Sequence, residues 1–257
     1  MALTKVIGAG LGATQEGAIT FNEGSADADF RVESNGQTHM LFVDGGNNSV
    51  GLGSSTPDSG RKLHIEGNDT TVGITLKDTA GGQFGINSDG GSLTIKSDST
   101  ATVYMTMDST GAVTLPKQPA FAAIGSSTPT LAINTTYVLP VDTERFDQNA
   151  DFNTSNYTFT APVTGRYQLN GSIYMYNHLD ASAGYMIFTI RTSNEEYQFP
   201  ITSSMFGSDI ANFGMNISAL ADMDASDTAV IDIFQQAGAA QVTISGGHTH
   251  FNGFLVC

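Results

Sequence analysis

Apolar and polar residues alternate along short stretches of this chain with a period of two. In the clearest stretch, residues 152–176, the alternation stops at a turn that contains Pro162 and Gly165 and resumes at Tyr167. A period of two is typical of a strand with one buried face, whereas a helix repeats every 3.6 residues. The stretch therefore predicts two β-strands joined by a tight turn.

The same pattern recurs along the rest of the chain, at intervals of roughly 8–12 residues and with turn residues between the segments. The strands predicted in this way cover residues 18–21, 29–34, 39–44, 49–53, 62–67, 72–78, 83–88, 92–97, 103–108, 112–116, 120–125, 135–140, 156–161, 165–177, 184–193, 197–202, 214–223, 228–236, 241–246 and 250–257. We expect an all-β protein. In the first half, a β-sandwich, a β-solenoid and a fibrous trimeric β-prism all fit.

Strands in the first half carry few apolar residues each. A single chain would bury little surface with them, so a core shared among several chains is the better physical solution. Two prolines, Pro116 and Pro119, then mark a linker between the two halves.

Composition narrows the classes of partner. The 257 residues include 29 glycines and no tryptophan, and the net charge is −15. Binding of nucleic acid requires clustered Lys and Arg, which are absent, so no nucleic-acid partner is expected. No apolar run is long enough to span a membrane, and the first residues lack the usual export signal, so neither membrane insertion nor standard secretion is expected. The lone Cys257 has no internal disulfide partner.

Two sets of residues resemble known families. Phe159, Pro162, the Gly165–Tyr167 segment and the closing segment 251–256 resemble the globular-head domain of complement component C-one-q and its tumour-necrosis-factor-like relatives. This resemblance implies a trimeric jelly-roll β-sandwich over residues 118–257. Because fold alone does not give function, it leaves the activity open.

The second resemblance lies in the first half of the chain. Asn48, the segment 50–53, Pro57 and the segment 63–65 resemble the shaft of tail-fibre and tailspike proteins of bacterial viruses. It implies a β-rich trimeric fibre shaft over residues 18–117. Residues 1–17 are small, apolar and glycine-rich, and we expect them to anchor the fibre to other virion proteins, because such a segment orders only on docking.

The resulting hypothesis is a homotrimeric structural fibre protein of a bacteriophage virion, assembled in the host cytoplasm. Its jelly roll would attach to a glycan or protein of the host cell surface. One alternative is a head or tail decoration fibre without a specific receptor, and another is a glycan-cleaving tailspike.

Candidate receptor-binding residues lie in polar segments between the strands of the second half, because binding residues are commonly carried by loops on a rigid scaffold. They are His178, Asp180, Glu195, Glu196 and Asp209. Aromatic residues at strand spacing, including Tyr174, are expected instead in the core or between subunits.

Catalytic motifs are absent from the sequence, so no enzyme activity is expected. The neighbouring carboxylates Glu195–Glu196 and Asp222/Asp224 could form a glycosidase pair, although such neighbours usually decorate loops. No cofactor is expected, with one alternative. If His248 and His250 lie on a strand, they point to the same side, and a trimer would bring six imidazoles to an axial metal ion.

Overall fold

A computed structural model describes residues 27–67, 71–79 and 81–257, except for the side chain of His178. The chain divides into two compact units, residues 1–114 and 115–257. In the described residues no helix is long and apolar enough to cross a membrane. The predicted anchor at residues 1–17 and the predicted strand at 18–21 lie outside the described residues.

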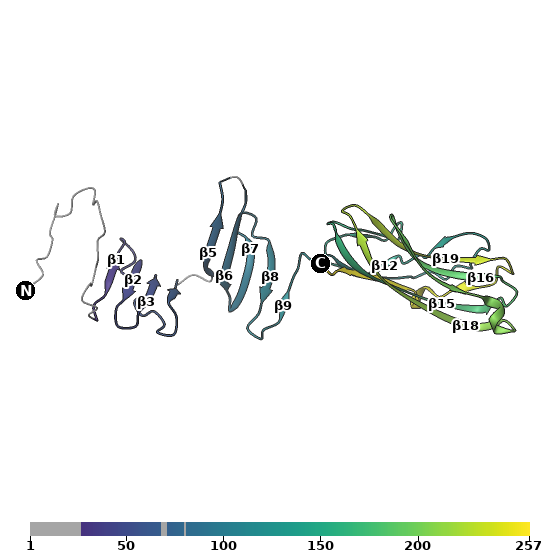
Figure 1. Ribbon diagram of the computed structural model, residues 1–257, viewed down its shortest axis with the longest axis horizontal. Coiled ribbons are helices and arrows are strands. Elements are labelled where there is room, and N and C mark those ends of the chain that lie inside the picture. The colour runs from purple at the N-terminus through teal and green to yellow at the C-terminus, as the bar shows by residue number, and fades with distance from the viewer. Residues whose placement is uncertain (1–26, 68–70, 80) are drawn as a thin grey trace, which may run out of the picture. The chain divides into compact units, whose positions relative to one another are not determined.

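The first unit contains two separate sheets (Figure 1). One has the order β1-β2-β3-β4, in which β3 and β4 are parallel. Its strands are β1 (Phe30–Val32), β2 (Leu41–Asp44), β3 (Ser49–Leu52) and β4 (Leu63–Ile65). The other is an antiparallel meander of β5 (Thr71–Lys77), β6 (Gln83–Asp89), β7 (Ser92–Ser97), β8 (Val103–Met107) and β9 (Val113–Thr114).

The second unit is a β-sandwich of two sheets. Sheet I has the order β12-β10-β21-β15-β18, and β20 also pairs with β15. Its strands are β12 (Thr143–Asp147), β10 (Ala120–Ile124), β21 (His250–Leu255), β15 (Gly165–Leu179), β18 (Ile210–Met223) and β20 (Thr243–Ile244). The last strand, β21, therefore lies between β10 and β15, which both come much earlier in the sequence.

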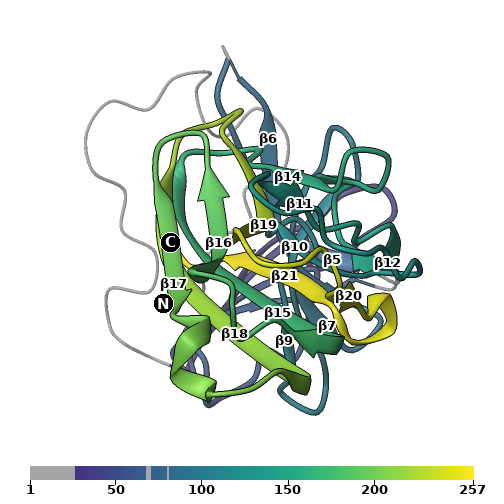
Figure 2. The same cartoon turned by 90° about the vertical axis from the view of Figure 1, so that its right-hand side faces the viewer.

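Sheet II has the order β13-β14-β19-β16-β17, and β11 also pairs with β19. Its strands are β13 (Phe152–Asn153), β14 (Thr158–Thr160), β19 (Thr228–Gln236), β16 (Tyr185–Thr192), β17 (Glu196–Ile201) and β11 (Tyr137–Val138). Two short 3₁₀ turns, η1 (Ser203–Phe206) and η2 (Gly246–His248), complete the unit, and η1 lies at the end that faces the viewer in Figure 2.

The core of this unit lies between the two sheets because each strand turns its alternate apolar residues inward. Tyr167, Leu169 and Ile173 of β15 are at most 2% exposed. At one end, the ring of Phe121 stacks on Phe159 with centroids 4.6 Å apart. Such offset aromatic pairs add to the stability that burial provides.

The predictions of an all-β fold and of a jelly-roll sandwich in the second unit are confirmed. Two strands were missed. β12 is an edge strand of mostly exposed residues, and β13 has only two residues, so neither shows a buried alternate face. The division of the chain falls between Thr114 and Leu115, a few residues before the expected boundary at residue 118.

Candidate functional site

The outward face of sheet I is formed by the alternate residues of its strands that do not enter the core. On β15 these include Gln168, Asn170 and Ser172, which lie between buried neighbours. The register places Asn252 of β21 and Ser218 of β18 directly opposite Asn170. Because opposite side chains on neighbouring strands are in contact, these amides and hydroxyls form a continuous row.

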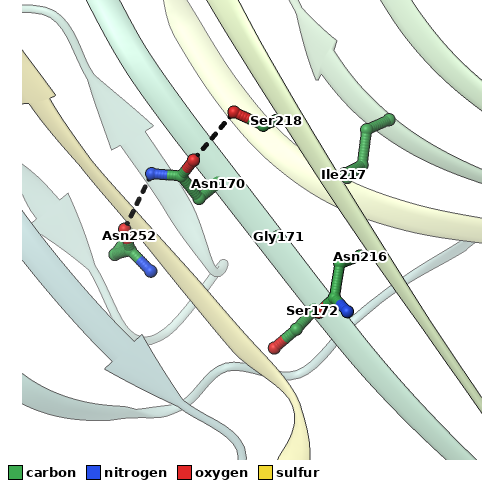
Figure 3. A pocket seen from close by; sticks show the side chains of 7 residues that line it. All are labelled: Asn170, Gly171, Ser172, Asn216, Ile217, Ser218 and Asn252. Carbon is green, nitrogen blue, oxygen red and sulfur yellow. Dashed lines mark hydrogen bonds between the residues drawn. The ribbon is translucent and has the colours of Figure 1, made fainter.

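Hydrogen bonds hold this row together. Figure 3 shows that Asn170 Nδ2 donates to Asn252 Oδ1 at 3.1 Å and that Ser218 Oγ donates to Asn170 Oδ1 at 3.0 Å. Gln168 Nε2 in turn donates to Ser218 Oγ at 2.8 Å. The amide of Asn170 therefore uses both its donor and its acceptor, and its position is fixed by two neighbouring strands.

A shallow depression of about 330 Å³ lies over this row (Figure 3). It is lined by Asn170, Gly171, Ser172, Asn216, Ile217, Ser218 and Asn252. Within the part of the chain that the structure describes, the side chains of Ser172 and Asn216 make no hydrogen bond of their own, so their donors and acceptors are available to a partner.

Large apolar side chains flank the depression on the same face. Leu220 and Phe254 lie directly opposite Gln168, and they are 54% and 47% exposed. Phe146 of β12 is 54% exposed. It lies opposite Ala122, which in turn lies opposite Asn252, so Phe146 belongs to the same row as Asn252. Exposed apolar groups beside hydrogen-bonding groups are typical of surfaces that meet another protein.

The three central rows of this face carry no acidic side chain, whereas the next row pairs Arg166 with the exposed Asp222. The central rows consist of Ala120, Phe254, Gln168 and Leu220; of Phe146, Ala122, Asn252, Asn170 and Ser218; and of Thr143, Ile124, His250, Ser172 and Asn216. In a chain with a net charge of −15 this is unusual. Two copies can bring these central rows together without placing carboxylates of the rows against each other.

The candidate receptor residues lie at two different ends of the sandwich. Asp180 and Asp209 are near the start of β16, and Ala181 N donates to Asp209 Oδ1 at 3.0 Å. Asp180 is only 6% exposed, and its carboxylate accepts hydrogen bonds from Ser182 and from the backbone of Ala239. Asp180 therefore joins two loops, while the exposed Asp209 faces solvent.

Glu195 and Glu196 lie at the other end of β16, in its hairpin with β17. Glu196 forms an ion pair with Arg191. Figure 1 shows the C-terminus at one end of the second unit and the coil of η1 at the other. His178 belongs to β15 by its backbone rather than to a loop. Its side chain lies outside the described residues.

His248 and His250 do not share one strand, which was the condition for the alternative of an axial metal ion. His248 ends the 3₁₀ turn η2, which begins at Gly246, and only His250 belongs to β21. His248 contacts the ring of Tyr174 at 5.4 Å, and its Nδ1 is 2.9 Å from Ser245 Oγ. Burial, the charge of Arg145 and that of His248 lower the pKa of His250.

Among the described residues, no group of three or more His, Cys, Asp or Glu side chains is arranged to hold a metal ion. Arg145 also places a positive charge near His250. A metal shared between copies therefore remains a hypothesis without support from the geometry of one chain.

The carboxylates considered for a glycosidase pair have structural contacts. Glu196 pairs with Arg191, and Asp224 accepts a hydrogen bond from Thr164 at 3.3 Å. Cys257 is an exposed free thiol.

Sequence reasoning missed the amide row of sheet I. Its signal was present in the predicted strand at 165–177, where Gln168, Asn170 and Ser172 occupy the alternate positions opposite to the apolar ones. That Asn252 and Ser218 lie beside them depends on pairing between distant strands.

No protein-family model matches this sequence, and no curated protein matches it. Among solved structures, the globular domain of zebrafish complement 1qA is similar over 55% of this chain and 98% of its own, with 18% identity and a TM-score of 0.42. Two crystal structures of murine APRIL, at pH 8.0 and 8.5, cover 55% of this chain and 100% of their own. Their identities are 10% and 9% and their TM-scores 0.40 and 0.39. At these identities the likeness is one of fold alone.

Proposed function

We propose that this chain is a homotrimeric structural fibre protein of a bacteriophage virion, which presents its jelly roll for attachment to the host surface. The observation that supports the proposal is the absence of acidic side chains from the three central rows of the outward face of sheet I, in a chain with a net charge of −15. Self-association through these rows buries Leu220, Phe254 and Phe146 and places no carboxylate of the rows against another. The resemblance of residues 48–65 to fibre shafts supports the virion assignment.

In this proposal the amide row lies inside the assembly. Asn170 is already paired with Asn252 and Ser218, so both polar atoms of that side chain keep a partner when it is buried. Ser172 and Asn216 would find partners on the neighbouring copy. Host attachment is then assigned to the loops near the start of β16, where Asp209 lies.

Sedimentation tests the assembly. The chain has a mass of 26.9 kDa, so a homotrimer sediments at roughly 81 kDa, three times that value. Leu220→Asp introduces a carboxylate into the central rows and should raise the protein concentration needed for assembly. Tyr185→Asp, on the outward face of sheet II, is the matched control and should leave the mass unchanged. A monomeric wild-type chain at micromolar concentration would contradict the proposal.

Host attachment is tested separately by incubating the purified protein with envelope glycans of the host. Retention of the protein on uncleaved glycans supports attachment. Shortened glycans would identify a glycan-cleaving tailspike instead, and neither retention nor cleavage would favour a decoration fibre without a specific receptor.

A further inference from the structure

The meander β5–β9 of the first unit has two unlike faces. Alternation and register place the apolar side chains together on one of them, here called the apolar face: Val72, Ile74, Leu76, Phe84, Ile86, Leu93, Ile95, Met105, Met107 and Val113. One row, formed by Ile74, Ile86, Ile95 and Met105, crosses four strands without a polar side chain. The rings of Phe84 and Tyr104 lie 5.9 Å apart.

The opposite face, here called the polar face, carries Gly73, Asn87, Thr94, Thr106 and Thr114 in one row. The charged side chains of these strands also lie on it, since Lys77, Asp89 and Lys96 alternate with the apolar residues. Lys96 Nζ is 3.6 Å from Asp89 Oδ2. The apolar face itself carries no charge.

Nothing in the described chain covers the apolar face. Leu76 is 58% exposed, Val113 51% and Phe84 50%, whereas Asn87 and Thr94 on the polar face are buried. Among the described residues before 115, Phe42 alone is a buried hydrophobic residue, and every other member of that class lies between 121 and 251. A single-layer sheet with one such face requires a partner to be stable in water.

We propose that the apolar face of β5–β9 packs against the same face of the other copies of this chain, forming a core between chains. The inference rests on the proposed homotrimer and assigns this second surface to it. Charge favours identical copies as the occupants. A chain of net charge −15 repels its own copies except where contact is free of charge, and the apolar face meets that condition. Each copy also supplies an apolar face of equal extent.

The test uses the full chain with Cys257→Ser, which removes the natural thiol. Ile86→Cys places a new thiol in the middle of the apolar face, and Thr106→Cys places one on the polar face as a matched control. Ile95→Cys, in the same row as Ile86, serves if the first variant fails to fold. Each variant is treated with a bulky maleimide under native conditions and, separately, with copper–phenanthroline, and its mass is measured by sedimentation.

We expect Ile86→Cys to form covalent dimers on oxidation and to react with maleimide at least about tenfold more slowly than Thr106→Cys. If the protein is trimeric but Ile86→Cys reacts as fast as the control and forms no cross-link, the inference is wrong and the proposed homotrimer stands. Protection without cross-linking would mean that another segment covers the face, which also overturns the inference. A monomeric mass would overturn both.

Discussion

Asp232 lies on the outward face of sheet II, yet its side chain is only 1% exposed. Arg191 covers it and donates from Nε to Asp232 Oδ2 at 2.7 Å. Burial raises the pKa of Asp232, and the guanidinium of Arg191 opposes that rise. Without Arg191 this carboxyl would have to bind a proton or remain charged and buried, and both lower the stability of the fold.

Arg191→Met is therefore expected to lower the free energy of unfolding by about 3 kcal/mol, measured by urea denaturation. Adding Asp232→Val should restore most of the loss, because no buried charge remains. Glu196→Gln, which removes the more exposed partner of the same arginine, should change stability by less than about 1 kcal/mol. Equal effects of Arg191→Met and Glu196→Gln would contradict this account.

His250 should make the fold sensitive to mild acid. Because burial lowers its pKa in the folded state below 6.5, the unfolded chain binds the proton more readily. The stability contribution is complete above pH 6.5 and is lost as the pH falls toward the folded pKa. His250→Asn should lose less stability than the wild type between about pH 7.5 and pH 5.5 in urea titrations. Parallel curves would show that His250 is not the sensor.

The histidine pair also predicts a result for metals. Since His248 lies outside the strand that carries His250 and Arg145 lies near His250, we expect no stoichiometric transition metal in protein purified without chelator or affinity tag. Elemental analysis measures this directly. A stoichiometric metal, together with a melting temperature that falls on addition of chelator, would contradict this prediction and support the hypothesis of an axial metal ion.

At the scale of elements, η2 connects β20 to the closing strand β21 and must pass close to the loop after β10. Gly246 permits this passage, because a methyl group there would overlap the backbone carbonyl oxygen of Ser127. The next residue, Gly247, has open space around the same position. Two adjacent glycines thus face different steric demands.

Gly246→Ala should lower the free energy of unfolding by about 3 kcal/mol, because the obstructing atom belongs to the backbone and cannot rotate away. Gly247→Ala, its matched control, should stay within about 0.5 kcal/mol of the wild type. Both values come from urea denaturation of the full chain. A tolerated Gly246→Ala would mean that the turn shifts readily.

At the scale of the whole molecule, the two units obtain their stability in different ways. The second unit has its own core between sheets I and II. The sheet β5–β9 exposes its apolar side chains and, in our proposal, buries them only against other copies. Assembly and folding of the first unit would then be one process, so its unfolding midpoint should rise with protein concentration.

Residues 1–17 are predicted to anchor the fibre to other virion proteins. Deleting them should leave an assembly of unchanged subunit number, because the deletion removes neither the face of sheet I nor the apolar face of β5–β9. The truncated protein should fail to enter particles, measured by immunoblotting of purified virions against full-length protein. Normal incorporation would contradict the anchor.

The positions of most strands could be predicted from the sequence. Period-two alternation located β15, which was expected at 165–177 and is observed at Gly165–Leu179, because each inward residue there must be apolar. The edge strand β12 was not predicted, because most of its residues are exposed and exposed residues need not alternate between apolar and polar. The small number of apolar residues per strand before residue 115 also predicted a core shared among several chains for the first half, and this stays a prediction.

Only the tertiary structure decided which residues share a surface. Alternation shows that the two faces of a strand differ, but the neighbours on a face depend on pairing between segments far apart in the chain. Asn170 lies beside Asn252 because β21 inserts between β10 and β15, and the three central rows without acidic side chains arise from that order. Similarly, His248 lies outside β21 because the backbone forms a 3₁₀ turn before that strand begins. The turn passes close to the backbone of Ser127 at Gly246.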